Sequence, residues 1–214
     1  MNTLTVDFLK DALRGHAPKP VGDLRRYSVL LPLVEKDGAL HVLYELRAAD
    51  LDVQPGEISF PGGRIEENET PEEAVLRETA EELGLPEDSV EIIAELDYLV
   101  TYSNLMVFCF LGVIDPDALE RAAVNRAEVE ECFLVPLEWL LENKPEIYMN
   151  RLAIQPAEDL PVEKLTPRGG YRWRAGTSAV PVYTWPDPQT GSERVIWGIT
   201  ARLTMAFANL LRVN

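Results

Sequence analysis

The segment from residue 63 to residue 85 constrains the fold most, because it specifies one helix from start to end. Thr70 has the side chain of an N-cap, Pro71 suits the first helical position, and Glu73 completes a capping box with Thr70. At the other end, Gly84 suits the left-handed conformation that commonly follows the last helical turn. The sequence therefore predicts a helix that begins at Pro71 and ends just before Gly84.

The predicted helix separates acidic from apolar side chains. At about 100° per residue, Glu82 lies about 40° to one side of Glu78 and Glu81 about 60° to the other. The opposite side of the helix, between about 100° and 200°, carries Leu76, Thr79, Ala80 and Leu83. We therefore expect one buried stripe and, facing away from it, three crowded carboxylates.

Three like charges on one helical turn are unfavourable unless a positive charge lies between them. Arg77 can pair with Glu81 one turn later, but one guanidinium cannot balance three carboxylates. A hard divalent cation such as Mg²⁺ or Mn²⁺ can, since it prefers oxygen ligands and often shares its shell with a substrate phosphate. A solvated acidic face is the alternative. The Gly-Gly turn at residues 62–63, the arginine and both helix caps favour the metal site.

The spacing of these residues resembles the signature of the Nudix hydrolases. Gly63 is followed after five residues by Glu69, and after seven more by the run from Arg77 to Leu85, which reads RETAEELGL. Thr79 departs from the signature, which usually has an aliphatic residue there, and this change concerns packing more than chemistry. Nine spaced positions form a far more specific pattern than a lone glycine motif.

The resemblance implies a metal site built on this helix, with Mg²⁺ or Mn²⁺ as cofactor. Glu78 and Glu82 would bind the metal directly, and Glu81 would bind a second ion or act through water. The carbonyl of Gly62 or Gly63 commonly completes the shell in this family. These positions are the metal ligands that the resemblance carries over to this chain.

The same resemblance implies that Arg77 and Glu69 hold the ligands in place. We assign Arg77, Glu81 and Glu82 to the catalytic machinery, together with one further carboxylate that acts as general base. For that base we choose Glu128, because the family often places such an acid just before a strand–helix element. Glu130 is the second choice for the base, and a surface acidic patch is the alternative for both residues.

Composition limits the partners and the compartment. The chain of 214 residues has a formal net charge of −16 at pH 7, which argues against a nucleic-acid polymer as partner. A small anionic substrate is compatible with this charge when metal ions bridge the repulsion. Charged residues within positions 7–14 argue against a signal peptide or a membrane span, so we expect a cytoplasmic protein. Cys109 and Cys132 lie in apolar stretches, which predicts two buried thiols and no disulfide or zinc site.

The order of the expected elements favours a single α/β/α sandwich with a mixed β-sheet over residues 1–214, which is also the fold that the Nudix resemblance implies. An amphipathic helix over 3–14 and a C-terminal hairpin plus helix over 178–212 are expected as family-type extensions. Residues 145–176 show little periodicity and are expected to be a long loop with one short strand at most. The remaining expected strands are residues 27–34, 39–46, 90–100, 105–114 and 131–135, with a short helix over 137–141.

Two further segments resemble the coenzyme A diphosphatase branch of the family. Upstream of the signature, the branch pattern matches this chain at Leu43, Arg47, Ala48, Gly56, Phe60, Pro61, Gly62 and Gly63. The chain departs from that pattern at Tyr44, Glu45 and Asp52, where the last replaces an arginine. Near the C-terminus, residues 196–203 match the branch's Trp-Gly-(Leu/Ile)-Thr-Ala element. The matches together extend from residue 43 to residue 203.

Three residues are expected to bind the substrate, namely Arg47, Phe60 and Arg168. Arg168 belongs to a basic cluster in the loop 164–174, which is unusual in so acidic a chain. This loop is the best candidate for gripping a terminal phosphate. A solvated basic loop without a ligand is the alternative.

The resemblance implies hydrolysis of a diphosphate linkage in a small nucleoside derivative. The leading hypothesis is a diphosphatase that splits coenzyme A or an acyl-coenzyme A into phosphopantetheine and adenosine 3′,5′-bisphosphate. The second is a diphosphatase for ADP-ribose, dinucleoside polyphosphates or another nucleoside diphosphate derivative. The third is a non-catalytic Nudix-like binding module, against which the intact acidic signature argues. We expect no membrane partner, and a homodimer is left open.

Overall fold

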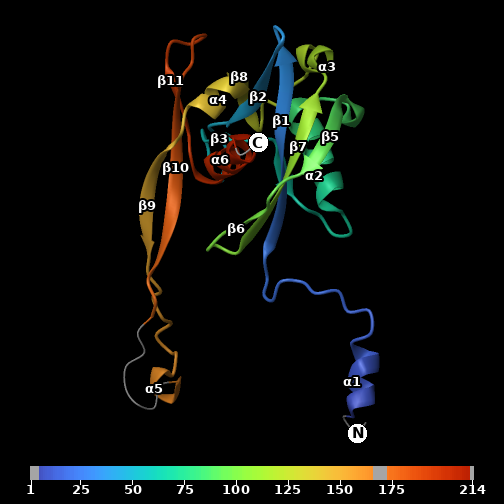
Figure 1. Cartoon of the computed structure of the whole chain (residues 1–214), viewed down its shortest axis with the longest axis vertical. Coiled ribbons are helices and arrows are strands. Elements are labelled where there is room, and N and C mark those ends of the chain that lie inside the picture. The colour runs from blue at the N-terminus through green and yellow to red at the C-terminus, as the bar shows by residue number, and fades with distance from the viewer. Residues whose placement is uncertain (1–4, 166–172, 213–214) are drawn as a thin grey trace.

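The computed structural model of the protein describes residues 5–165 and 173–212 (Figure 1). Its centre is an eight-stranded sheet with the main path β3-β2-β1-β7-β5, to which β4, β6 and β8 add by pairing with β1, β7 and β2. β1 and β7 are parallel, and the other pairs of this sheet are antiparallel. The strands are β1 (Arg25–Lys36), β2 (Ala39–Arg47), β3 (Ile58–Ser59), β4 (Gly62–Arg64), β5 (Val90–Glu95), β6 (Leu99–Val100), β7 (Leu105–Ile114) and β8 (Val129–Pro136).

Helices cover both faces of this mixed sheet. Alternate residues of β1 point to opposite sides, so Leu31 packs in one apolar cluster with Phe207 of α6, while Leu30 packs in another with Leu83 of α2. Figure 1 shows α2 and α6 on opposite sides of β1, which confirms the predicted α/β/α sandwich. The helices are α1 (Val6–Ala12), α2 (Pro71–Leu83), α3 (Pro116–Glu120), α4 (Leu137–Glu142), α5 (Val162–Leu165) and α6 (Gly198–Arg212), with a 3₁₀ turn η1 at Glu87–Ser89.

α2 begins and ends where the sequence predicts. The Thr70 side chain accepts a hydrogen bond from the Glu73 amide at 3.2 Å, and the Glu73 carboxylate accepts one from the Thr70 amide at 2.8 Å. Gly84 follows the helix with φ of 64°, and a Cβ at this position would clash with the Ala123 carbonyl. Glycine is therefore required at residue 84 both by its conformation and by the close approach of another segment.

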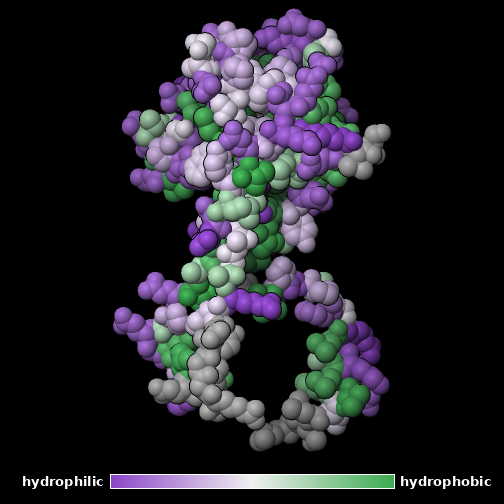
Figure 2. Space-filling view, turned by 60° about the vertical axis from the view of Figure 1, so that its left-hand side comes forward, coloured by the Kyte–Doolittle hydropathy of each residue, from purple (hydrophilic) through white to green (hydrophobic). Residues whose placement is uncertain are grey.

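The segment after α4 is more regular than predicted. Residues 145–176 are expected to be a long loop with one short strand at most, and they contain the seven-residue strand β9 (Glu146–Leu152) and the short helix α5. β9 pairs antiparallel with β10 (Gly176–Pro186), which also pairs with β11 (Glu193–Ile196). β9 is exposed over nearly its whole length, so its sequence lacks the alternation that reveals a half-buried strand. Figure 2 shows the molecule narrowing below its main body, where apolar groups reach the surface, and the exposed apolar residues of β9 are Ile147, Tyr148 and Met149.

The N-terminal helix is shorter than predicted. α1 spans Val6–Ala12 rather than residues 3–14, of which residues 3 and 4 lie outside the described part, and none of its seven described residues is buried. In Figure 1 it lies away from the sheet at the end of an extended segment. The amphipathic pattern of this helix therefore does not correspond to a face packed on the core. That residues 1–214 form a single domain stays a prediction.

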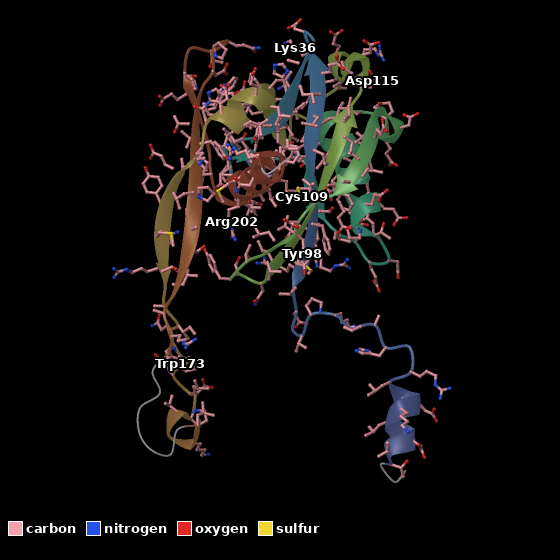
Figure 3. The ribbon with its side chains drawn as sticks, in the orientation of Figure 1. Lys36, Tyr98, Cys109, Asp115, Trp173 and Arg202 are labelled. Carbon is pink, nitrogen blue, oxygen red and sulfur yellow. The ribbon has the colours of Figure 1, made fainter. Side chains whose placement is uncertain are left out.

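The two cysteines differ in burial. Both are free thiols; Cys109 is buried within the sheet, near the middle of the body in Figure 3, and Cys132 on β8 is only partly buried. Burial raises the pKa of each thiol to about 12, so both are poor nucleophiles. The prediction of two buried thiols is therefore confirmed for Cys109 and wrong for Cys132, which is only partly buried.

Candidate active site around helix α2

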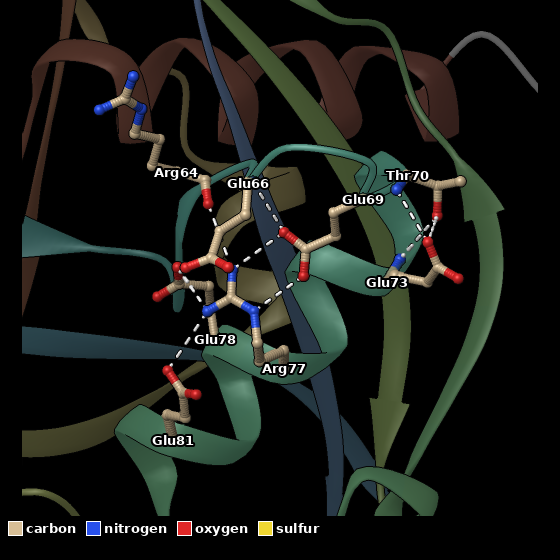
Figure 4. Close-up of polar contacts among 8 residues, drawn as sticks. All are labelled: Arg64, Glu66, Glu69, Thr70, Glu73, Arg77, Glu78 and Glu81. Carbon is tan, nitrogen blue, oxygen red and sulfur yellow. Dashed lines mark hydrogen bonds and ion pairs between the residues drawn. The ribbon is translucent and has the colours of Figure 1, made fainter.

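Arg77 contacts three carboxylates, those of Glu69, Glu78 and Glu81, which together form the outer side of the site (Figure 4). Its guanidinium donates two hydrogen bonds to Glu69, from Nε at 2.8 Å and from Nη2 at 3.1 Å. The remaining Nη1 donates to Glu78 at 3.0 Å and to Glu81 at 3.3 Å. The hydrogen bonds from Arg77 lower the pKa of Glu69. This network fixes the positions of the carboxylates on this side. That Arg77 and Glu69 thereby hold metal ligands in place, as the family resemblance implies, stays a prediction.

The Gly-Gly turn makes room for the Glu78 carboxylate. A Cβ on Gly63 would clash with the carboxylate group of Glu78, which packs directly on the β4 backbone. Burial is the main cause that raises the pKa of Glu78, and the contact with Arg77 opposes it. The glycine of the signature therefore places this half-buried carboxylate between the helix and the sheet.

Glu82 is buried, which corrects the prediction that all three glutamates face away from the packed side. Its side chain is 3% exposed, whereas that of Glu81 is 61% exposed. Glu82 Oε2 accepts a hydrogen bond of 2.7 Å from the Gly62 amide. A segment from beyond β7 covers the end of the helix, since the Asn125 amide donates to the Glu82 carbonyl at 2.9 Å. The helix therefore has contacts on two sides, which periodicity within α2 alone does not reveal.

Glu45 on β2 is a second buried carboxylate in this region, and it was not among the predicted site residues. The residue is fully buried, and its Oε1 accepts a hydrogen bond of 2.8 Å from the Ser59 hydroxyl. Burial raises the pKa of Glu45 to about 7. Burial, followed by repulsion from Glu45, raises the pKa of Glu82 to about 9. An ionisable residue inside the apolar run 42–46 was the signal that could have identified it.

The two predicted substrate-binding residues that the structure describes, Phe60 and Arg47, differ in their surroundings. Phe60 is 3% exposed and stacks on Tyr44 with ring centroids 5.0 Å apart, within the core. Arg47 acts electrostatically on Glu45 and Glu82, and one of its Nη atoms donates to the Val53 carbonyl at 3.5 Å. Arg168 lies outside the described residues.

Of the two candidate bases, Glu128 is the one beside the carboxylate cluster. Its charge contributes to raising the pKa of both Glu45 and Glu78. The Asn125 side chain donates a hydrogen bond of 3.2 Å to Glu128. Glu130 is exposed on β8. The assignment of the base to Glu128 stays a prediction, and its position is compatible with that role.

The donors around α2 fit a hard divalent cation. Within residues 5–165 and 173–212, no three Asp, Glu, His or Cys side chains already converge as a closed metal site. The region nonetheless offers several carboxylates against the two guanidinium groups of Arg77 and Arg47. One buried oxygen, Glu45 Oε2, has no hydrogen-bond partner in the described part of the chain. Carboxylate oxygens that lack balancing positive charge are the donors that Mg²⁺ and Mn²⁺ prefer.

Comparison with known proteins agrees with this chemistry. A family model described as the NUDIX domain matches residues 24–153. Over 187 residues the chain is 29% identical to peroxisomal coenzyme A diphosphatase NUDT7 of Mus musculus, covering 87% of this chain and 70% of that protein. Over 189 residues it is 32% identical to mitochondrial coenzyme A diphosphatase NUDT8 of Homo sapiens, covering 86% and 68%. Nudix hydrolase 3 of Caenorhabditis elegans is 40% identical over 117 residues, covering 54% and 49%.

Proposed function

The chain belongs to the Nudix family of diphosphate hydrolases, and from this premise we propose that its substrate is coenzyme A or an acyl-coenzyme A. The products would be phosphopantetheine, or its acyl form, and adenosine 3′,5′-bisphosphate. The observation that carries this proposal is the extent of the similarity to the two coenzyme A diphosphatases. It covers 86–87% of the chain, well beyond the residues of the family domain.

The site supports hydrolysis with a divalent cation, which we propose to be Mg²⁺ or Mn²⁺. Glu78, Glu81 and Glu82 would hold the ion, and the Arg77–Glu69 pair would keep Glu78 and Glu81 in position. When bound, such an ion neutralises phosphate oxygens and lowers the pKa of a coordinated water.

The chain's own residues would supply positioning and proton transfer. The Gly62 amide restrains one oxygen of Glu82, which fixes the direction in which the other oxygen points. We propose that Glu128, held by Asn125, accepts the proton of the attacking water. The oxygen of that water bonds to one phosphorus as the bond from this phosphorus to the bridging oxygen breaks, and the other phosphate leaves with the bridging oxygen.

One observation favours the second substrate class. Of the upstream coenzyme A pattern, Phe60 is buried in the core, and the exposed Asp52 replaces an arginine. A coenzyme A site would therefore lack part of the positive surface that the branch pattern supplies. ADP-ribose and dinucleoside polyphosphates remain the alternative substrates for the same chemistry.

A hydrolysis screen tests the proposal. The purified protein would be incubated with coenzyme A, acetyl-coenzyme A, ADP-ribose and diadenosine polyphosphates, with Mg²⁺ or Mn²⁺, and products would be identified by mass spectrometry. We expect adenosine 3′,5′-bisphosphate from coenzyme A at the highest kcat/KM. Efficient cleavage of ADP-ribose without cleavage of coenzyme A would establish the second class. Binding without turnover of any compound would establish the third hypothesis, a binding module.

The predicted compartment and partners of the protein rest on its sequence. No helix in the described residues has the length and apolar character needed to cross a membrane. The cytoplasm stays the predicted compartment, while the relatives carry names that refer to peroxisomes and mitochondria. A homodimer and the absence of nucleic-acid polymers among the partners also stay predictions.

A further inference from the structure

We propose that Glu45 is an additional ligand of the metal site, which it would reach from strand β2 of the sheet. This assignment rests on the proposed metal-dependent hydrolysis and extends the site beyond the signature segment. It concerns a residue at which this chain departs from the coenzyme A branch pattern.

The backbone places Glu45 and Glu82 beside one short segment. Glu45 lies opposite Ser59 in the β2–β3 pairing and accepts a hydrogen bond from that serine at 2.8 Å. Three residues further on, the Gly62 amide donates to Glu82 at 2.7 Å. On β2, Leu43 packs in the same apolar cluster as Leu83. Because side chains alternate along a strand, Glu45 faces α2 as Leu43 does.

The two carboxylate oxygens of Glu45 differ in their partners. Oε2 is buried and makes no hydrogen bond with any described residue. A buried carboxylate oxygen without a partner is costly, so in native structures such an oxygen usually accepts from a protein donor or a water or contacts a cation. Asp187 shows the usual arrangement in this protein. It is also buried, but one of its oxygens accepts from Arg194 at 3.0 Å and the other from the Gln189 amide at 2.9 Å.

Arg47 does not supply the missing partner. It acts on Glu45 and Glu82 through space, but no ion pair joins it to either residue within the described part of the chain. Its own Nε is buried without a hydrogen-bond partner there. Two neighbouring buried carboxylates that repel each other therefore share one guanidinium that contacts neither of them. A divalent cation held by Glu45 Oε2 and Glu82 would satisfy the unpartnered oxygen and offset the repulsion.

Mn²⁺ binding tests the assignment directly. The dissociation constant of the full-length protein for Mn²⁺ would be measured by calorimetry and by electron paramagnetic resonance, for wild type and for Glu45→Gln. Glutamine keeps an oxygen to accept from Ser59 but removes the charge. We expect the Glu45→Gln substitution to weaken Mn²⁺ binding about 10- to 100-fold. Glu91→Gln on β5, the same change at an exposed strand position, is the matched control and should leave binding unchanged.

A second variant guards against a folding defect. Glu45→Asp keeps the charge but withdraws both oxygens by one methylene, so a direct ligand should lose affinity in this variant also. The near-ultraviolet circular dichroism spectrum reports whether each variant retains its fold. Affinity for Mn²⁺ equal to wild type in a folded Glu45→Gln or Glu45→Asp protein would overturn the assignment, leaving Glu45 as a protonated structural residue.

The measurement also separates this assignment from the proposed function. If the substitutions at Glu45 weaken Mn²⁺ binding while the wild type cleaves no nucleoside diphosphate derivative, the assignment stands and the function fails. If the wild type cleaves coenzyme A and Glu45→Gln binds Mn²⁺ normally, the function stands and the assignment fails. A wild type that binds no Mn²⁺ overturns the assignment, and one that in addition cleaves no nucleoside diphosphate derivative with Mg²⁺ or Mn²⁺ overturns both.

Discussion

The two sides of the acidic site differ in how their charge is balanced. On the outer side, Arg77 contacts Glu69, Glu78 and Glu81, so that part of the site is held together without a ligand. On the inner side, Glu45 and Glu82 are buried together, and burial raises the pKa of both. The outer network is therefore preorganised by the protein, whereas the inner pair needs either protons or a cation. We therefore expect metal binding to change the protonation and the stabilising contribution of the inner carboxylates more than those of the outer ones.

Glu82→Gln is expected to have the largest effect, because it removes the charge of the inner ligand on α2. We expect kcat/KM to fall about a thousandfold, equivalent to about 4 kcal/mol of transition-state stabilisation. The variant should fold, since glutamine can still accept from the Gly62 amide. Steady-state hydrolysis with Glu72→Gln, an exposed position of the same helix, as control would check this. Near wild-type turnover in Glu82→Gln would remove the functional distinction between the two sides.

Leu83→Ala tests the helix orientation that turns Glu82 inward. Leu83 is fully buried in the cluster between α2 and the sheet, so the substitution should lower the free energy of unfolding by about 2–5 kcal/mol. Urea denaturation would measure the change, with Leu211→Ala at an exposed position of α6 as control. Equal stability of the Leu83→Ala and wild-type proteins would mean that α2 is packed differently.

Arg77→Lys addresses the outer side alone. Lysine keeps the positive charge but cannot donate the paired hydrogen bonds to Glu69 while also reaching Glu78 and Glu81. We expect kcat/KM to fall about 10- to 100-fold. Arg121→Lys, an exposed arginine at the end of α3, serves as control in the same assay. A loss as large as that of Glu82→Gln would show that both sides depend equally on fixed geometry.

Asp52→Arg is expected to have the smallest effect, because residue 52 is exposed and outside both carboxylate groups. Asp52 would repel the anionic coenzyme A by about 1 kcal/mol. Replacing it with arginine should therefore lower KM for coenzyme A severalfold and leave kcat nearly unchanged. Initial rates over a range of coenzyme A concentrations would resolve the two constants. An unchanged KM would mean that coenzyme A does not pass near this residue.

The sequence predicts the outer side well because its signals are local. Thr70, Gly84 and the Arg77–Glu69 spacing all act within the segment 63–85, so the helix and its network follow from neighbouring residues. Glu82 is buried against residues outside the helix, among them Gly62, whose amide donates to its carboxylate. That contact is set by tertiary packing, which a helical periodicity cannot report.

Two other features were beyond prediction for related reasons. Glu45 lies on a central strand that is buried on both faces, so the usual alternation of polar and apolar residues does not mark which side chains meet α2. β9 is exposed on both sides, and its pairing with β10 arises from backbone hydrogen bonds rather than from a buried pattern. In both cases the strand lacks the half-buried pattern on which prediction depends.

The metal-induced change in melting temperature as a function of pH tests the central claim most directly. The pKa of Glu45 and Glu82 is higher in the folded than in the unfolded state, so without metal these residues bind more protons when folded. Their contribution to stability is therefore present at low pH and is lost as pH rises through about 7 for Glu45 and about 9 for Glu82. Mn²⁺ competes with those protons, so its stabilising effect should grow over the same range.

The account predicts that, in EDTA, the wild-type melting temperature falls from pH 5 to pH 9, that Mn²⁺ reverses this fall, and that Glu82→Gln weakens both effects. A wild-type protein whose melting temperature does not respond to Mn²⁺ at any pH, or responds as strongly in Glu82→Gln, would contradict it.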